Sequence, residues 1–238
     1  MPNLEVVHEN NDYIVVNKMA GLISEKSPYE DCTVEDQVFN HLLKSKRKPF
    51  VGVIHRLDRV TSGVLVFAKK KSVLTEFNDL LFSRKAQKTY LAIVKNNPPK
   101  KKENLINFLV KNHREKRADI IQSKSKDSLD CSLSYQVIGK NDFGYLLEIK
   151  PKTGRFHQIR AQLSNIGLPI IGDVKYSSDQ EYFPFSICLH AWKFTYQVPG
   201  SKEFKTFEAP LPKNNFWNSF RPGLSNESTN LKKENRLY

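Results

Sequence analysis

One short stretch of the chain concentrates ionisable side chains between two apolar runs. Asp58 is flanked by Arg56 and Arg59, and His55 comes just before them. A carboxylate between buried strands is costly unless it is paired or used in chemistry. Asp58 is therefore a candidate nucleophile. The alternative is a structural aspartate that accepts hydrogen bonds from the amides of a turn reaching Thr61.

Two other residues are candidates for the same site. A helix beginning near residue 157 places Ile159 and Leu163 on an apolar stripe, with Arg160 at its edge. Arg160 can thus point out of the core, although most helical arginines lie on the surface. Tyr90 lies in a predicted strand, where a phenol can stack on a ring or move a proton but is more often part of the core.

Apolar runs predict the elements that carry these residues. Residues 51–54 and 64–68 predict buried strands on both sides of Asp58, and Gly63 allows a turn with a positive φ angle. Thr33 with Asp36 predicts a helix cap, followed by a helix that ends in the basic run before residue 49. A second helix is predicted over 72–84, with Leu74, Phe77 and Leu81 on its apolar face. Further strands are predicted at 13–17, 88–94, 105–110, 117–122, 129–138, 145–149, 186–196 and 204–208, those from 105 to 149 as an antiparallel meander.

The motifs together resemble a known family. The segment from His55 to Gly63 matches all seven fixed positions of His-Arg-Leu-Asp-x-x-Thr-Ser-Gly, the signature of the RluA-type RNA pseudouridine synthases. Residues 88–94 resemble the family's Lys-x-Tyr-x-Ala segment, and residues 151–160 resemble Pro-x-Thr-Gly-Arg-x-His-Gln-Ile-Arg. Residues 169–173 and 189–191 also match in order, so the resemblance covers roughly residues 12–212.

The resemblance implies a fold and an activity. The fold would be α+β, the pseudouridine synthase fold, with a central mixed, largely antiparallel sheet flanked by helices and loops. The enzyme would isomerise a specific uridine in structured ribosomal or transfer RNA, without a cofactor or metal. Asp58 would be the nucleophile, Arg160 its ion-pair partner that keeps it ionised, and Tyr90 a stacking partner of the base, while Arg56 would assist base flipping. We expect Arg160→Ala to abolish turnover with the fold intact.

The same resemblance implies a wider set of residues around the RNA. Among them, His55, His157 and Arg155 are expected mainly to hold the shape of the loops. The RNA-binding residues implied are His55, Arg56, Arg59, Thr61, Arg155 and His157.

Composition is consistent with an RNA partner. Lysine and arginine exceed aspartate and glutamate by 38 to 25 among 238 residues, a net charge of +13, and several basic residues occur in runs. These runs favour nucleic acid over a membrane, because none lies on an obvious amphipathic helix with an aromatic face. Three scattered cysteines argue against a disulfide framework or a zinc site. We expect a cytoplasmic monomer with no obligate protein partner, its catalytic domain spanning residues 1–221 and a polar, flexible tail spanning 222–238.

Two other function classes are compatible with parts of the sequence. A metal-dependent RNA hydrolase could use His55, Asp58, His157, Asp173 and His190, although their spacing matches no recognisable ligand set. A passive RNA-binding module would explain the charge but not the cluster around Asp58. Release of the uracil C5 hydrogen from RNA would separate the isomerase from both.

Overall fold

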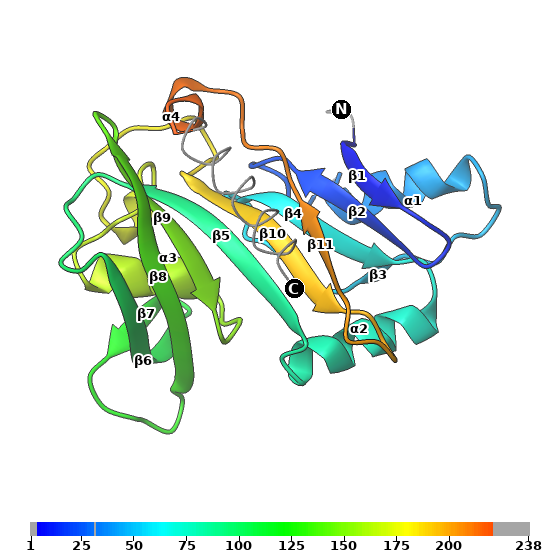
Figure 1. Ribbon diagram of the computed structural model, residues 1–238, viewed down its shortest axis with the longest axis horizontal. Coiled ribbons are helices and arrows are strands. Elements are labelled where there is room, and N and C mark those ends of the chain that lie inside the picture. Colours follow the sequence, from blue (N-terminus) through cyan, green and yellow to red (C-terminus); the bar gives the residue numbers. More distant parts are fainter. Residues whose placement is uncertain (1–3, 31, 221–238) are drawn as a thin grey trace, which may run out of the picture.

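A single mixed sheet dominates the part of the chain that the computed structural model describes, residues 4–30 and 32–220 (Figure 1). Its order is β1-β2-β4-β10-β5-β9-β8-β6-β7, with β11 paired to β10 and β3 paired to β4. Among these pairings only β4 with β10 is parallel, so the predicted α+β fold with a largely antiparallel sheet is confirmed. The strands are β1 (Val6–Glu9), β2 (Tyr13–Lys18), β3 (Gly52–Val53), β4 (Ser62–Ala68), β5 (Ala86–Val94), β6 (Lys102–Asn112), β7 (Arg117–Ile121), β8 (Leu129–Asn141), β9 (Gly144–Pro151), β10 (Leu189–Gln197) and β11 (Phe204–Glu208).

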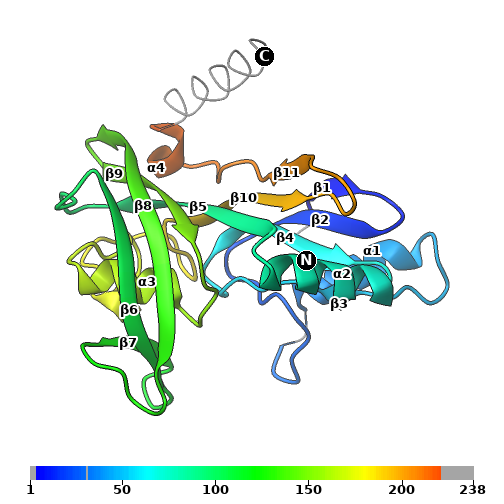
Figure 2. The ribbon, with the colours of Figure 1, turned by 60° about the horizontal axis from the view of Figure 1, so that its bottom comes forward.

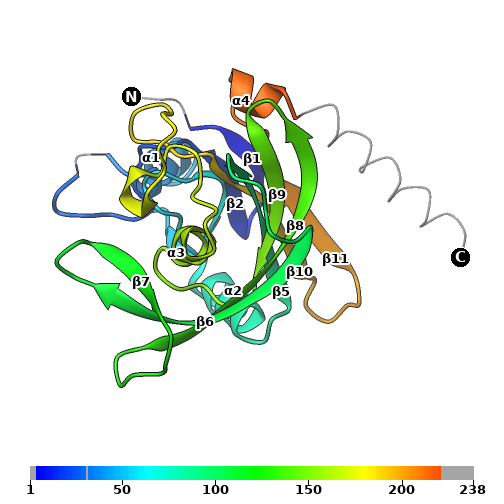
Figure 3. The same cartoon turned by 90° about the vertical axis from the view of Figure 1, so that its left-hand side faces the viewer.

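Helices cover the sheet in two places. α2 (Lys71–Phe82) packs on β4 and β10, whereas α3 (Gln158–Asn165) lies within the curve formed by β6 to β9 (Figures 2 and 3). The other helical segments are α1 (Val34–Leu43), the 3₁₀ turn η1 (Val174–Tyr176) and α4 (Asn215–Asn218). Within the described residues, none of these helices has both the length and the apolar character needed to cross a membrane.

The first helix forms as its sequence predicts. The Thr33 side chain accepts a hydrogen bond from the Asp36 amide, and the Asp36 carboxylate accepts one from the Thr33 amide, so the two residues form a capping box. Val34, Val38 and Leu42 are buried. The helix ends at residue 43, and the basic run that follows it is exposed.

The predicted apolar face of α2 was wrong by one position at each end. Val73, Phe77 and Leu80 are the buried residues, whereas Leu74 and Leu81 are only partly buried. Both sets of residues form an apolar stripe at helical spacing. The choice between them depends on where β4 and β10 lie beneath the helix, which the local pattern does not contain.

The four strands β6 to β9 also depart from the simple meander that was predicted. β6 and β7 form a hairpin, but β8 pairs with β6 instead of β7. β6 is therefore an inner strand, and its buried side chains Leu105 and Leu109 face inward, where α3 lies against β6 and β7. α3 follows β9 after a short connection, and its Arg160 lines the same pocket as Tyr90 of β5, where the candidate site lies.

Buried side chains connect distant parts of the described chain, while the single catalytic domain and its limits stay predictions. One cluster of buried side chains extends from Ile14 in β2 to Trp217 in α4. The Trp217 indole donates a hydrogen bond of 3.0 Å to the Tyr182 hydroxyl, which attaches α4 to the loop before β10. The predicted tail over 222–238 lies outside the described residues.

Candidate active site

A pocket of about 90 Å³ gathers residues from four of the five matched sequence segments, all except 169–173. Asp58 lies on the loop between β3 and β4, Tyr90 on β5, and Arg160 on α3. Segments that are 102 residues apart in the chain thus meet in one hollow. The residues around it are Arg56, Leu57, Asp58, Thr61, Lys88, Tyr90, Pro151, Thr153, Gly154, Arg155, His157, Gln158, Ile159, Arg160 and Leu189.

The Asp58 loop is held in shape by the segment that follows β2. The Ser24 hydroxyl donates to the Leu57 carbonyl at 2.9 Å and accepts from the Leu57 amide at 3.0 Å. The Thr61 amide donates to the Asp58 carbonyl at 3.0 Å, which closes the turn. The carboxylate is therefore carried on a loop whose backbone is fixed on both sides, which lowers the reorganisation needed for chemistry.

A buried lysine that sequence reasoning missed also pins this loop. Lys18, at the end of β2, is 1% exposed, and its ammonium donates to the carbonyls of Leu22 at 2.6 Å, Met19 at 3.0 Å and Arg59 at 3.1 Å. Burial lowers the pKa of Lys18 to about 7, whereas the negative charge of Asp58 acts to raise it. Its position directly before a turn was the only signal in the sequence, and that signal is weak.

The glycine beside the loop is required by a close backbone contact. Gly63 has φ +118° and lies opposite Ala191 where β4 and β10 run parallel. A Cβ atom at Gly63 would lie 2.1 Å from the Ala191 carbonyl oxygen. Gly63 lies within β4 and not in the turn that was predicted, but the positive φ angle is confirmed, and this position needs glycine for both its φ angle and its space.

Arg160 contacts Asp58, but its main partner is another carboxylate. Its Nη1 lies 3.3 Å from Asp58 Oδ2, whereas Nε and Nη2 donate to the two carboxylate oxygens of Asp173 at 2.7 and 2.8 Å. The Arg160 and Asp173 side chains are 5% and 1% exposed. Arg160 is thus clamped by Asp173 in a two-point ion pair and presents its remaining amino group to Asp58.

This clamp was missed by sequence reasoning. Asp173 belongs to a matched family segment and was considered only as a ligand in the rival metal site. A carboxylate after Gly172, near the end of an apolar run, was the available signal. Nothing in the spacing of Asp173 and Arg160 indicates that they touch, because the chain between them leaves the helix and turns back.

The pKa of Asp58 is shifted in the opposite direction to the one predicted. Burial raises the pKa of the Asp58 carboxyl above its ordinary value, and the charges of Arg160 and Lys18 oppose that effect without overcoming it. The carboxyl is 27% exposed toward the pocket. A carboxylate with a raised pKa is a better nucleophile and base than an ordinary one, provided that it is ionised at the working pH.

His157 connects Asp58 to a buried tyrosine. Its Nε2 lies 2.9 Å from Arg160 Nη1, which can only donate, so Nε2 accepts and the proton lies on Nδ1, 3.0 Å from the Tyr176 hydroxyl. Burial lowers the pKa of His157 to about 3, with the charge of Arg160 acting in the same direction. The imidazole is therefore neutral, and its 3.8 Å contact with Asp58 is not an ion pair at neutral pH.

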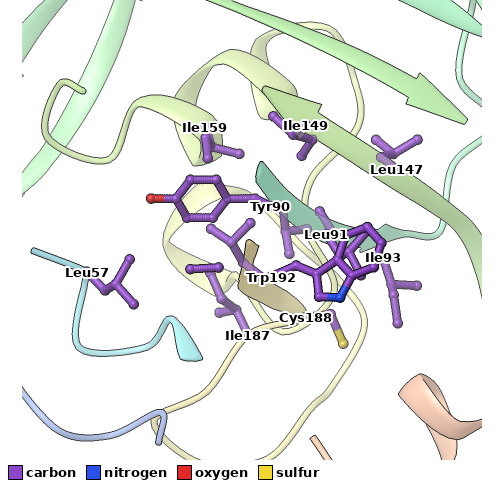
Figure 4. Close-up of a cluster of buried hydrophobic side chains, with 14 of the residues drawn as sticks. Leu57, Tyr90, Leu91, Ile93, Leu147, Ile149, Ile159, Ile187, Cys188 and Trp192 are labelled. Atoms are coloured by element: carbon purple, nitrogen blue, oxygen red, sulfur yellow. The ribbon is translucent and has the colours of Figure 1, made fainter. Parts of the chain in front are cut away.

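Tyr90 presents its hydroxyl to the pocket and its ring to the core. Its side chain is 6% exposed and packs in the cluster that contains Ile159 and Leu57. Figure 4 shows the hydroxyl pointing away from the buried side chains around Leu91 and Ile93. No other described residue is hydrogen-bonded to it, and burial together with the charge of Asp58 raises the pKa of the phenol. Tyr90 is therefore a neutral phenol with a free hydrogen-bonding group in the pocket.

The two arginines that flank Asp58 in the sequence point away from it. Arg56 is exposed and its Nη1 donates to Glu25 at 2.5 Å, whereas Arg59 pairs with Glu30. Arg56 still lies at the rim of the pocket, but Arg59 does not line it. The expected pairing of a buried carboxylate is thus provided by Arg160, not by its neighbours in the chain.

Three other residues were predicted to bind RNA. Thr61 is buried at the wall of the pocket, and its hydroxyl has no partner among the described residues. Arg155 is exposed at the rim, and its Nε donates to the Asp130 carbonyl at 3.3 Å. His55 corrects the prediction: it is 8% exposed, stacked on Phe194 at 5.1 Å, and absent from the pocket. Its ring fills core space and cannot reach RNA in this arrangement. A buried position is compatible with the other role expected for His55, holding the shape of the loop.

The residues of the rival metal site do not converge on one point. Asp58, His157 and Asp173 surround the guanidinium of Arg160, so a protein cation occupies the space between them. His55 is stacked in the core, and His190 is hydrogen-bonded to the Ser62 hydroxyl at 2.8 Å. Within residues 4–30 and 32–220, no group of three or more histidine, cysteine or acidic side chains is placed to hold a metal ion.

Comparison with known proteins gives a consistent result. A sequence model described as RNA pseudouridylate synthase matches residues 12–165. The chain is 34% identical over 179 residues to an uncharacterized RNA pseudouridine synthase of Haemophilus influenzae, with 75% of each chain covered. It is 29% identical to tRNA pseudouridine synthase C of Vibrio parahaemolyticus, with 87% of this chain and 90% of the relative covered. The solved structure of human RNA pseudouridylate synthase domain containing 4 shares the fold, with a TM-score of 0.72, 23% identity and coverage of 88% and 89%.

Proposed function

The chain belongs to the RluA-type RNA pseudouridine synthases, isomerases that act on RNA, and from this premise we propose that Asp58 is the nucleophile that isomerises a specific uridine in structured transfer or ribosomal RNA. The observation that carries this proposal is the position of Asp58, ionisable and partly exposed at the floor of a pocket, beside the clamped guanidinium of Arg160. Relatives whose printed names specify transfer RNA or the large ribosomal subunit support both substrate classes.

The reaction needs one bond broken and one bond made at the sugar. The bond between C1′ and N1 of uracil breaks, a bond between C1′ and C5 forms, the C5 hydrogen leaves as a proton, and N1 gains a proton. Substrate and product are isomers, so no oxidant or reductant is consumed. The Asp58 carboxylate can add to the sugar carbon or to the base, and either route leaves the base held in the pocket for reattachment.

Arg160 acts in this scheme as a positioned cation. Because Asp173 holds two of its nitrogens, the third amino group stays beside Asp58 without the side chain having to be ordered during the reaction. It opposes the effect of burial on the Asp58 pKa and thus favours the ionised form that a nucleophile requires. The neutral His157 fills the other side of the guanidinium and adds no competing charge.

Tyr90 and Arg56 have roles toward the base in this proposal. Tyr90 lines the pocket with little of its ring exposed, so its role toward the base rests mainly on its neutral hydroxyl, which can donate a hydrogen bond or pass a proton. Tyr90→Phe is expected to keep the KM for RNA and lower kcat, since only the hydroxyl is lost. Arg56, exposed at the rim, can enter the stack vacated when the uridine is extruded, a step that costs a few kcal/mol.

Hydrogen release from RNA labelled with tritium at uracil C5 tests the assignment. The wild-type protein is expected to release tritium in the presence of EDTA and without any added cofactor, and Asp58→Asn is expected to release none. Release by Asp58→Asn at the wild-type rate would remove Asp58 from the reaction. RNA cleavage that stops with EDTA would instead support the hydrolase. We further propose that the enzyme acts as a cytoplasmic monomer.

A further inference from the structure

A second hollow opens directly from the candidate active site. It has a volume of about 570 Å³ and shares four lining residues with the pocket: Lys88, Pro151, Thr153 and Gly154. The remaining wall comes from the end of α2, the start of β5 and the residues around β10 and β11, which lie together at one end of these strands (Figure 1). We call this hollow the basic groove. Its other lining residues are Leu81, Arg84, Lys85, Ala86, Gln87, Lys152, Thr195 and Phe204.

The charge of this groove is positive and uncompensated. Four of its lining residues are Arg84, Lys85, Lys88 and Lys152, and none of its lining residues is acidic. Salt bridges within the described part of the chain involve none of these four cations. By contrast, many residues of the basic runs along the sequence are neutralised by a neighbour: Lys69 by Glu9, Lys70 by Asp12, Lys100 by Glu103 and Arg117 by Asp119.

Lys88 lies where the pocket and the groove join. It is two residues before Tyr90 on β5, so both side chains point to the same face of the strand. Its Nζ has no hydrogen-bond or ionic partner among the described residues, and a Cβ atom at Gly154 would lie only 3.6 Å from it. Burial lowers the pKa of Lys88, which indicates an ammonium with few compensating groups around it.

An aromatic side chain completes the groove. Phe204, at the start of β11, is 66% exposed and lines the groove, so its ring is accessible from it. Unpaired cations along a track, together with an exposed ring, are what a flexible nucleic-acid strand needs: phosphates bind the cations and a base can stack on the ring. Because the groove leads out of the pocket that would hold the target uridine, the adjoining nucleotides have a direct path into it.

We propose that the basic groove binds the phosphodiester backbone of the RNA strand on one side of the target uridine. This inference rests on the proposed function and adds the path that the strand takes away from Asp58. Lys88 contacts the phosphate nearest the target uridine, whereas Arg84 and Lys152 contact phosphates farther along the strand. The groove therefore determines affinity for the flanking segment, while the bond-breaking step stays in the pocket.

The test compares two variants that remove the same charge. Arg84→Gln/Lys152→Gln loses two exposed cations from the groove, and the control Lys46→Gln/Arg47→Gln loses two exposed, unpaired cations from the run that follows α1. Both pairs contain one arginine and one lysine, so net charge and composition change equally. Circular dichroism and the melting temperature establish that each variant is folded before its RNA affinity is measured.

The expected result is a selective loss of affinity. The groove variant raises the Kd for the RNA substrate about tenfold near 0.1 M salt and reduces the slope of log Kd against log salt by roughly 1.4, two contacts to a single strand at about 0.7 each. The control variant changes each quantity much less. Two truncated RNAs, one lacking the nucleotides 5′ of the target and one lacking those 3′ of it, then locate the strand. Relative to the wild-type protein, the groove variant still binds one truncated RNA more weakly. It binds the other truncated RNA, which lacks the segment that the groove would contact, as well as the wild-type protein does.

Two outcomes would overturn the proposal. Equal losses in both variants would mean that the groove acts only through net charge. A loss that persists with both truncated RNAs would place the contacts elsewhere on the RNA. The Kd is measured without turnover, so the two tests are independent. Failure of the wild-type protein to make pseudouridine would refute the proposed function, whereas the affinities of the variants would still decide whether the groove binds RNA.

Discussion

The clamp on Arg160 makes a specific prediction for Asp173→Asn. This substitution keeps the size of the side chain but removes the negative charge that receives two hydrogen bonds, at 2.7 and 2.8 Å, from Arg160. The guanidinium is then left with Asp58, at 3.3 Å, as its only ionic partner within the described residues. Asp173→Asn should therefore destabilise the fold and release Arg160 from its position in the active site.

The magnitude follows from the burial of the pair. Both side chains are almost inaccessible, at 5% and 1% exposed, and removing one partner of a buried ion pair costs about 3–5 kcal/mol. In a domain of this size, each kcal/mol lowers the melting temperature by roughly 2–4 °C, so we expect a decrease of about 6–20 °C. A guanidinium displaced by about 1 Å is expected to lower kcat on the order of 100-fold.

The assay combines thermal unfolding with single-turnover kinetics at a temperature where the variant is folded. Asp179→Asn is the control, because Asp179 is exposed and lies six residues farther along the same loop. The double variant Arg160→Met/Asp173→Leu replaces both charges with apolar groups and should be more stable than either single variant, although inactive. A melting temperature for Asp173→Asn within 2 °C of the wild type, together with unchanged kcat, would refute the reasoning.

The same clamp revises the prediction that Arg160→Ala would leave the fold intact. Loss of the guanidinium leaves the Asp173 carboxylate, 1% exposed, without its partner. An uncompensated buried charge is strongly destabilising, so Arg160→Ala confounds loss of chemistry with loss of structure. Arg160→Lys keeps a positive charge but loses the two-point geometry, and it is the better probe of the catalytic role.

Three further predictions concern the site and its support. Asp58→Asn should be inactive yet more stable than wild type at pH 7, because burial disfavours the ionised carboxyl; the gain should vanish as pH falls below the raised pKa of Asp58, and equal melting temperatures at pH 7 would contradict this. Gly63→Ala should lose more than about 3 kcal/mol in urea unfolding, since its Cβ would strike the Ala191 carbonyl; a loss below 1 kcal/mol would contradict the contact. Burial lowers the pKa of His190 to about 4, so below pH 6.5 the unfolded chain binds more protons than the folded chain. The free energy of unfolding should therefore fall by about 3 kcal/mol between pH 6.5 and pH 4 because of this residue. Urea unfolding at each pH should show a smaller decrease for His190→Gln, and an unchanged decrease would contradict this.

Local patterns were sufficient to predict most elements of the fold. The capping box at Thr33 and the strands around Asp58 depend on neighbours in the sequence, and the structure contains them where they were predicted. The buried face of α2 and the partner of β8 depend on distant segments, and both predictions were wrong in detail. Propensity and periodicity predict reliably that an element forms, but they predict less reliably which segment the element packs against.

The candidate site shows the same division. Fixed motif positions predicted Asp58, Tyr90 and Arg160 as site residues; all three line one pocket, and their roles stay predictions. The supporting residues could not be predicted, because Asp173 and Lys18 act through tertiary contacts with groups far along the chain. Their local sequence offered only weak signals, the turn after Lys18 and the matched segment that ends at Asp173.

Direct measurement of pseudouridine provides the clearest test of the central claim, that Asp58 acts on a uridine in this pocket. Transfer and ribosomal RNA from a strain lacking the protein would be incubated with the purified enzyme, digested to nucleosides and quantified by chromatography. The wild-type protein is predicted to raise the pseudouridine content of at least one of these RNAs, and Asp58→Asn is predicted to leave it unchanged while remaining folded. Pseudouridine formed equally by Asp58→Asn, or by neither protein on any of these RNAs, would contradict the account.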